Sequence, residues 1–76
     1  MKQVLEYILT LIIQKPEDLV VTETIIDDLN IQYLITANKD DVGKIIGKQG
    51  KIIQAIRNIA KIWAAKNNKQ IRIDVS

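Results

Sequence analysis

All three glycines of the 76-residue chain lie within eight positions, at Gly43, Gly47 and Gly50. The surrounding residues are basic and apolar, and a long helical pattern begins directly afterwards, at Lys51. Glycine costs about 1 kcal/mol relative to alanine inside a helix, so the segment 47–50 predicts a turn between two helices. A backbone without a Cβ lets a ligand come close. We therefore expect the function to lie at this turn, with a phosphate group as the ligand.

Length and residue usage restrict the classes of protein to consider. A chain of 76 residues supports one domain, over residues 1–76, and buries roughly 60% of the surface that its unfolded form exposes. The sequence contains no cysteine and no histidine. Disulfides, thiolate chemistry, the usual soft metal ligands and the commonest general base are therefore excluded. We expect neither an enzyme nor a protein with a metal or a cofactor.

The apolar segment near the N-terminus does not predict a membrane span. The run from Val4 to Ile13 is ten residues long and includes Glu6, whereas a span requires about 20 apolar residues. No small-residue cleavage site of a signal peptide follows it. We expect a soluble, cytoplasmic protein that does not insert into a membrane.

Charge is distributed unevenly along the chain. Residues 1–41 contain three lysines and eight acidic residues, a net charge of −5, whereas residues 42–76 contain eight basic residues and one acid, a net charge of +7. A charge run usually indicates only a solvated face. Here the basic part contains the glycine turn, and this combination is typical of a site for a polyanion such as nucleic acid or an anionic membrane surface.

Three helices are predicted from the spacing of apolar residues. The first covers residues 2–14, and Pro16 ends its pattern. The second covers residues 42–46, with an N-cap supplied by residues 38–41. The third runs over residues 51–66, after which two asparagines end it.

Three strands complete the chain. Residues 19–26 are rich in β-branched side chains, residues 27–30 supply turn chemistry, and residues 31–38 alternate between apolar and polar, so these segments predict a hairpin. Residues 70–76 alternate strictly, with Ile71, Ile73 and Val75 on one side. The order α-β-β-α-α-β predicts an α+β fold of two layers, with three helices and three strands.

The glycine turn and its neighbours resemble a known signature. Ile45-Ile46-Gly47-Lys48-Gln49-Gly50-Lys51-Ile52-Ile53 resembles the KH domain motif: an apolar pair, GxxG, then a helix with isoleucine at its third position. A bare GxxG is common, but GxxG framed by these pairs is specific. The element order resembles the type II, prokaryotic form over nearly the whole chain. The resemblance implies a KH type II domain, with three helices on one face of a three-stranded sheet, that binds single-stranded RNA.

This resemblance implies that the RNA backbone is held at Gly47-Lys48-Gln49-Gly50. KH domains clamp about four nucleotides at this loop. The helix that begins near Lys51 directs unpaired N–H groups and its positive dipole end at the same place, which favours phosphate. Lys48 adds mobile charge, and Lys44 and Lys51 flank the glycines closely enough to reach the RNA backbone.

The same resemblance implies an apolar groove for the bases. We assign its lining to Val42, Ile45 and Ile53, together with Ile35 on the neighbouring strand. Each of these residues has an ordinary alternative role in the core. Arg57 lies on the polar side of the long helix, where a solvated face is the expected explanation.

The long helix carries a second apolar surface. Its apolar residues sweep an arc of roughly 200°, which is more than one small sheet covers. We expect Ile59, Ile62 and Trp63 to form a protein interface, since tryptophan is enriched at such sites. The resemblance implies that the partner is a second copy of the chain or a larger Jag-type protein with a KH domain. It further implies a role as an RNA chaperone or post-transcriptional regulator linked to cell shape and cell-wall biogenesis.

Other classes fit the same residues less well. The glycine spacing satisfies neither the P-loop nor the dinucleotide-binding fingerprint. A helix-turn-helix protein would present polar side chains early in its second helix, where this chain has Ile52, Ile53 and Ala55. Two alternatives stay open: a module that binds only protein through the long helix, and a protein that binds single-stranded DNA.

Overall fold

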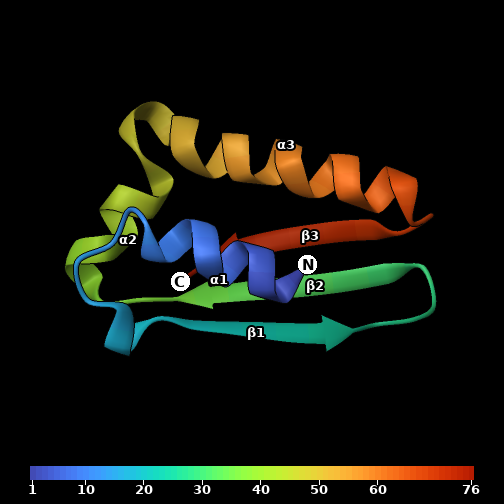
Figure 1. Cartoon of the computed structure of the whole chain (residues 1–76), viewed down its shortest axis with the longest axis horizontal. Helices are drawn as coiled ribbons and strands as arrows, with labels where there is room; N and C mark the ends of the chain where they lie inside the picture. The colour runs from blue at the N-terminus through green and yellow to red at the C-terminus, as the bar shows by residue number, and fades with distance from the viewer.

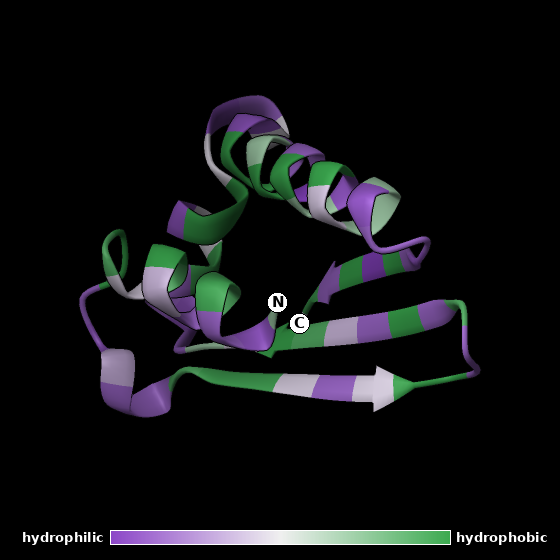
Figure 2. Ribbon diagram, turned by 45° about the vertical axis from the view of Figure 1, so that its right-hand side comes forward, coloured by the Kyte–Doolittle hydropathy of each residue, from purple (hydrophilic) through white to green (hydrophobic).

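The computed structural model describes all 76 residues as a sheet covered on one face by helices (Figure 1). Figure 2 shows the helices together on one side of the sheet. The predicted α+β class and the order α-β-β-α-α-β are confirmed. The elements are α1 (Lys2–Thr10), the 3₁₀ turn η1 (Pro16–Asp18), β1 (Val20–Ile25), β2 (Asn30–Thr36), α2 (Lys39–Ile46), the 3₁₀ turn η2 (Lys48–Gly50), α3 (Lys51–Lys66) and β3 (Gln70–Val75).

Strand β2 lies at the centre of the sheet. It pairs antiparallel with β1, where Val20 lies opposite Thr36, and parallel with β3, where Asn30 lies opposite Gln70. Parallel neighbours require a long crossover, and here α2 and α3 form it. The crossover leaves β3 at an edge of the sheet, next to α3 (Figure 1).

The hairpin between β1 and β2 is closed by Asp27. Its carboxylate accepts the backbone N–H groups of Leu29, at 2.8 Å, and Asn30, at 2.9 Å. The hydrogen bond from Leu29 is the main reason that the pKa of Asp27 lies below its ordinary value. The predicted turn chemistry is therefore confirmed, because an aspartate at this position replaces missing backbone partners.

The hydrophobic core lies between the sheet and the helices. Tyr33 and Ile35 of β2 are buried, whereas Leu34 between them is exposed, and Ile73 of β3 is buried between Arg72 and Asp74. The predicted alternation of these strands is thus confirmed. Burial of apolar side chains is the main stabilising term in such a small domain. The core residues are Leu5, Leu9, Ile13, Val21, Tyr33, Ile35, Ile45, Ile53, Ile56, Ala60 and Ile73.

Helix α3 has the predicted bounds, and α2 begins earlier than predicted. After α3, Asn68 adopts a left-handed φ of 53° and the Lys69 N–H donates to a carbonyl of the last helical turn. Helix α2 begins at Lys39 instead of 42. The side chain of Asn38 accepts the N–H of Asp40 at 3.0 Å, which is the geometry of an N-cap immediately before Lys39.

Helix α1 ends at Thr10, four residues before the predicted end of the segment 2–14. The N–H of Leu11 bonds to a carbonyl three residues back, which tightens the last turn. The backbone N–H of Gln14 then binds the side chain of Asp41 in α2 at 3.0 Å. A contact across 27 positions of sequence therefore ends this helix, although its apolar spacing continues.

No helix of the structure is both long and apolar enough to cross a lipid bilayer. No three acidic, histidine or cysteine side chains are grouped so that they could hold a metal ion.

Candidate nucleic-acid interface

The turn between α2 and α3 requires glycine at its first position. Gly47 has φ 76° and ψ 175°, a conformation that side chains with a Cβ rarely adopt. A Cβ at this position would also stand 2.6 Å from Cγ1 of Ile52. Both the backbone conformation at position 47 and the contact with Ile52 therefore require glycine.

The turn continues in left-handed conformations and ends at an uncapped helix. Gln49 has φ 57° and Gly50 has φ 73°. Gly50 is the N-cap of α3 and supplies no side-chain hydrogen bond, and the first turn of α3 contains no acidic residue. The first N–H groups of a helix have no partner within it. The N–H of Lys51 already bonds to the carbonyl of Lys48, so the donors that this end of α3 offers to an anion, beside its positive dipole end, come from the residues after Lys51.

Three lysines surround the turn, and they differ in exposure and in ion pairing. Lys48 and Lys51 are exposed, and neither forms an ion pair. The side chain of Lys44 is 39% exposed, and its Nζ lies 3.7 Å from a carboxylate oxygen of Asp41. Lys48 and Lys51 are therefore free to contact a phosphate, whereas Lys44 is shared with a carboxylate of its own helix.

Asp41 holds the first part of the chain against α2, a role that sequence reasoning missed. Its side chain is 1% exposed, and its two oxygens accept the N–H groups of Gln14, at 3.0 Å, and Lys15, at 2.9 Å. The N–H of Gln14 is the main cause that lowers the pKa of Asp41, and the nearby charge of Lys44 acts in the same direction. This carboxylate thus positions the helix that leads into the glycine turn.

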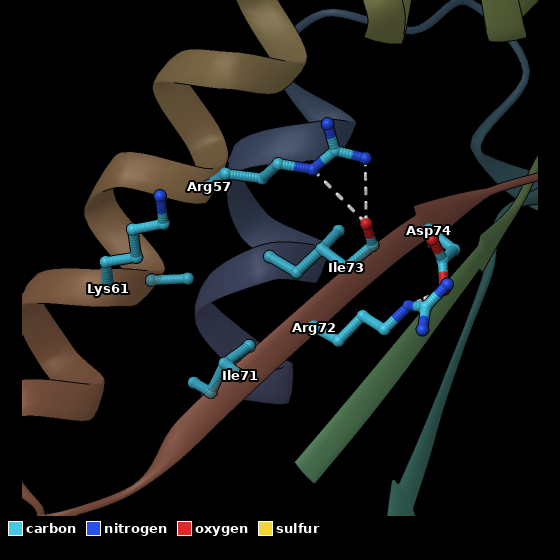
Figure 3. A pocket seen from close by; sticks show the side chains of 7 residues that line it. Arg57, Lys61, Ile71, Arg72, Ile73 and Asp74 are labelled. Atoms are coloured by element: carbon cyan, nitrogen blue, oxygen red, sulfur yellow. Dashed lines mark hydrogen bonds and ion pairs between the residues drawn. The ribbon is translucent and has the colours of Figure 1, made fainter. Parts of the chain in front are cut away.

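A cavity of about 290 Å³ lies between α3 and β3 (Figure 3). Arg57 is seven residues past Gly50, which corresponds to about 10 Å along α3 at ~1.5 Å per residue. The glycine turn and the cavity therefore lie along the same helix. In Figure 3, the side chains of Arg57 and Lys61 extend from α3 on the side of β3. The lining residues are Arg57, Ala60, Lys61, Ile71, Arg72, Ile73 and Asp74.

The sequence suggested that Arg57 lies on a solvated face, but the structure shows that its side chain contacts β3. Its Nε and Nη2 donate to the carbonyl oxygen of Ile73 at 3.2 and 2.9 Å (Figure 3). The guanidinium therefore connects α3 to the edge strand. Across the strand, Arg72 pairs with the carboxylate of Asp74 at 3.1 Å.

The structure places three of the four residues expected to line the groove in the core. Ile35 and Ile45 are both 0% exposed and belong to the core, so their side chains have no surface to offer a base. Ile53 is 6% exposed and faces the same core, while Val42 is partly exposed. The apolar pattern correctly identified residues that face inward, but these residues are buried between α2, α3 and the sheet.

The other flank of α3 carries exposed aliphatic side chains. Ile59 is 46% exposed and Ile62 is 63% exposed, while Trp63 is partly buried. The buried residues Ile56 and Ala60 lie beside them on the helix, because positions three, four and seven apart share one side, so the exposed flank continues the buried face. An apolar surface without a covering element is thus present where the sequence predicted it.

Comparison with known proteins identifies the family. The family model described as "KhpA/KhpB, KH domain" matches residues 2–75. RNA-binding protein KhpA of Listeria monocytogenes is 36% identical over 77 aligned positions, which cover 99% of this chain and 97% of the relative. The KhpA proteins of Clostridium perfringens (37% identical, 99% of both chains) and Chlamydia caviae (36% identical, 99% of this chain and 95% of the relative) are similar as well. No solved structure matches the chain significantly. The chain therefore belongs to the KhpA/KhpB family of KH domains.

Proposed function

We propose that this chain binds single-stranded RNA, with the RNA backbone at the turn Gly47-Lys48-Gln49-Gly50 and the bases in the cavity between α3 and β3. One observation carries the proposal: the glycine turn begins the helix that also forms one wall of a cavity lined by aliphatic and charged side chains. Relatives at 36–37% identity that are named RNA-binding protein support it.

The phosphate part of the site combines two kinds of attraction. Unpaired N–H groups at the start of α3 donate to phosphate oxygens, and the ammonium groups of Lys48 and Lys51 add charge from either side. Lys44 contributes to the extent that a phosphate competes with Asp41 for it. Glycines lower the stability of this segment, but they allow the sugar-phosphate backbone to pass at a short distance.

The base part of the site combines aliphatic and charged side chains. Ala60, Ile71 and Ile73 provide apolar surface in the cavity, and Val42 lies closer to the turn. No aromatic residue lines the cavity, so the proposed recognition differs from stacking on aromatic platforms. Unpaired bases fit such a groove because their faces and edges are both accessible.

The proposal is tested by fluorescence anisotropy with short labelled RNAs. The double variant Lys48→Asp, Gln49→Asp reverses charge at the turn, and we expect it to lose saturable binding while circular dichroism shows an unchanged fold. Lys2→Asp, Gln3→Asp is a matched control, since it makes the same substitutions on exposed residues of α1. Equal binding by the parent and the turn variant would reject this site.

The same titration with DNA of identical sequence separates the two nucleic acids. The 2′-hydroxyl is the group by which a protein distinguishes RNA from DNA. We expect tighter binding of RNA. Equal or tighter binding of DNA would favour the alternative, a protein that binds single-stranded DNA.

We further propose that the flank of α3 with Ile59, Ile62 and Trp63 pairs with a second copy of the chain or with a KhpB/Jag-type protein. The exposed aliphatic side chains on this flank support it, since such surfaces typically mark interaction sites. Two linked four-nucleotide sites would raise RNA affinity through effective concentration. Such avidity is what an RNA chaperone or post-transcriptional regulator built from a small module requires.

Analytical ultracentrifugation tests this interface. Ile62→Glu and Trp63→Glu place a charge on the flank, and we expect both variants to shift association toward the monomer. Leu11→Glu is the control, because Leu11, directly after α1, is an aliphatic residue about as exposed as Ile62. Unchanged association of both α3 variants would exclude this flank as the interface.

A further inference from the structure

The outer edge of β3 faces the cavity with its backbone. The N–H of Gln70 donates to Leu29, and the N–H of Ser76 donates to Ile35, so the even-numbered residues of β3 bond toward β2. Backbone groups alternate in direction along a strand. The N–H and C=O groups of Ile71 and Ile73 therefore point outward, at an edge that has no further strand beside it.

Arg57 occupies one of these edge groups. Its Nε and Nη2 both donate to the Ile73 carbonyl, at 3.2 and 2.9 Å, while Nη1 makes no hydrogen bond within the chain (Figure 3). The ion pairs of the structure are Lys44 with Asp41 and Arg72 with Asp74, so no carboxylate neutralises Arg57. A half-buried, unneutralised guanidinium thus lines the cavity.

This arrangement changes the hydrogen-bonding character of the cavity wall. Without Arg57, the strand edge would offer the Ile73 carbonyl as an acceptor for the amino group of a base. With Arg57 in place, that acceptor is covered and the wall presents the remaining N–H groups of the guanidinium. A base that brings a donor to this position would leave polar groups unpaired, which costs affinity.

The bases differ in the groups that they bring. Cytosine presents O2 beside N3, and guanine presents O6 beside N7, so each offers two adjacent acceptors that suit a guanidinium. Adenine has its 6-amino donor next to both N1 and N7. A wall of donors therefore accepts cytosine and guanine and disfavours adenine.

We propose that Arg57 is the residue that determines base preference in this cavity, by covering the Ile73 carbonyl and selecting bases with two adjacent acceptors over adenine. The inference rests on the proposed RNA binding and deepens it. Arg57 keeps a guanidinium N–H free for the base while its other donors hold it to β3. The strand edge thereby acts as the support that orients the guanidinium.

The test uses two six-nucleotide RNAs that end in uridines and carry four central cytosines or four central adenines. Affinity for each is measured by fluorescence anisotropy for the parent, Arg57→Ala and Arg57→Lys, with folding checked by circular dichroism. We expect the parent to prefer the cytosine RNA by about tenfold. Arg57→Ala should bring the two affinities to within about twofold, with binding of the adenine RNA held or improved because the carbonyl is uncovered.

Two further variants separate base preference from charge and from RNA binding itself. Arg57→Lys keeps the charge but cannot form the planar fork, so it should lose preference while retaining overall affinity. Arg72→Ala, which removes the arginine paired with Asp74, should weaken both RNAs equally. The preference is thus predicted to follow the fork of Arg57 and not the number of positive charges.

The outcomes that overturn the inference are distinct from those that overturn RNA binding. Equal affinity of the parent for both RNAs, or a cytosine preference that persists in folded Arg57→Ala, would reject the role of Arg57 while leaving RNA binding intact. Absence of binding by the parent, or binding that survives Lys48→Asp, Gln49→Asp, would reject the proposed site and this inference together.

Discussion

Gly47 and Ile52 are so close that the Cα hydrogen of the glycine occupies space which a methyl group could not. A Cβ built on Gly47 would lie 2.6 Å from Cγ1 and 2.8 Å from Cβ of Ile52. Ile52 is the second residue of α3, so this contact fixes the angle at which the helix leaves the turn. Gly47 is therefore required by the fold itself, in addition to any part that it has in ligand binding.

Alanine at position 47 should destabilise the protein more than alanine at the other helix-associated glycine. Gly47→Ala combines an unfavourable φ of 76° with the contact to Ile52, and we expect a loss on the order of 2 kcal/mol in the free energy of unfolding. Gly43 lies within α2 and has open space around it. Gly43→Ala should therefore raise stability by about 0.5–1 kcal/mol. Urea denaturation of both variants checks this; equal effects would contradict it.

Asp41 predicts a specific loss of stability in acid. Its pKa in the folded protein lies below the ordinary value of 3.8, so the unfolded state binds a proton at higher pH than the folded state does. The resulting stabilisation is complete above the ordinary value and is lost as pH falls through the lowered folded-state pKa. Thermal unfolding between pH 7 and pH 2 should show this decline.

Asp41→Asn is expected to lower the unfolding temperature at pH 7, because an amide replaces one acceptor of the Gln14 and Lys15 N–H groups with a donor. The difference between parent and variant should shrink as pH falls below about 4. Asp40→Asn is the matched control, since Asp40 is an exposed neighbour and its carboxylate forms no ion pair. A constant difference across pH would contradict the assignment.

RNA affinity should depend weakly on salt. About two or three phosphates neutralised on a single strand predict a slope of roughly −1.5 to −2 in a plot of log K against log salt concentration. Lys48→Gln should make the slope shallower by about 0.7, whereas Lys2→Gln on α1 should leave it unchanged. Anisotropy titrations over a series of salt concentrations measure this. A slope that Lys48→Gln does not alter would show that this ammonium group does not contact phosphate.

The end of α3 depends on a left-handed residue. Asn68 has φ 53°, a conformation that glycine and asparagine adopt more readily than alanine. Asn68→Ala should therefore reduce the free energy of unfolding by about 1 kcal/mol, while Asn68→Gly should preserve or slightly raise it. Urea denaturation of the pair gives the comparison, and similar losses in both variants would point to a side-chain role instead.

The sequence pattern was sufficient to predict those elements whose structure depends on residues close together in the chain. Helix α3 has its predicted bounds of 51–66 because an asparagine pair ends it within its own neighbourhood. The β1–β2 hairpin follows from Asp27, whose partners lie two and three residues away. Glycine spacing located the α2–α3 turn for the same reason, since φ values are local properties.

Contacts between distant residues account for what the sequence did not reveal. The early end of α1 depends on Asp41, which an apolar period cannot indicate. Ile35 and Ile45 were expected to line a groove, but periodicity shows only that a face is apolar and not whether other elements seal it. The hydrogen bonds of Arg57 to β3 depend on β3 being an edge strand, which is a property of strand order.

The parallel pairing of β2 with β3 also bears on how the protein is made. Partners in this ladder, such as Asn30 and Gln70, are separated by about 40 residues, so their contact forms late and slowly compared with the β1–β2 hairpin. One wall of the cavity consists of residues 71–74. During synthesis, the glycine turn can therefore form before β3 has left the ribosome, and a nascent chain would have the turn without the strand edge that holds Arg57.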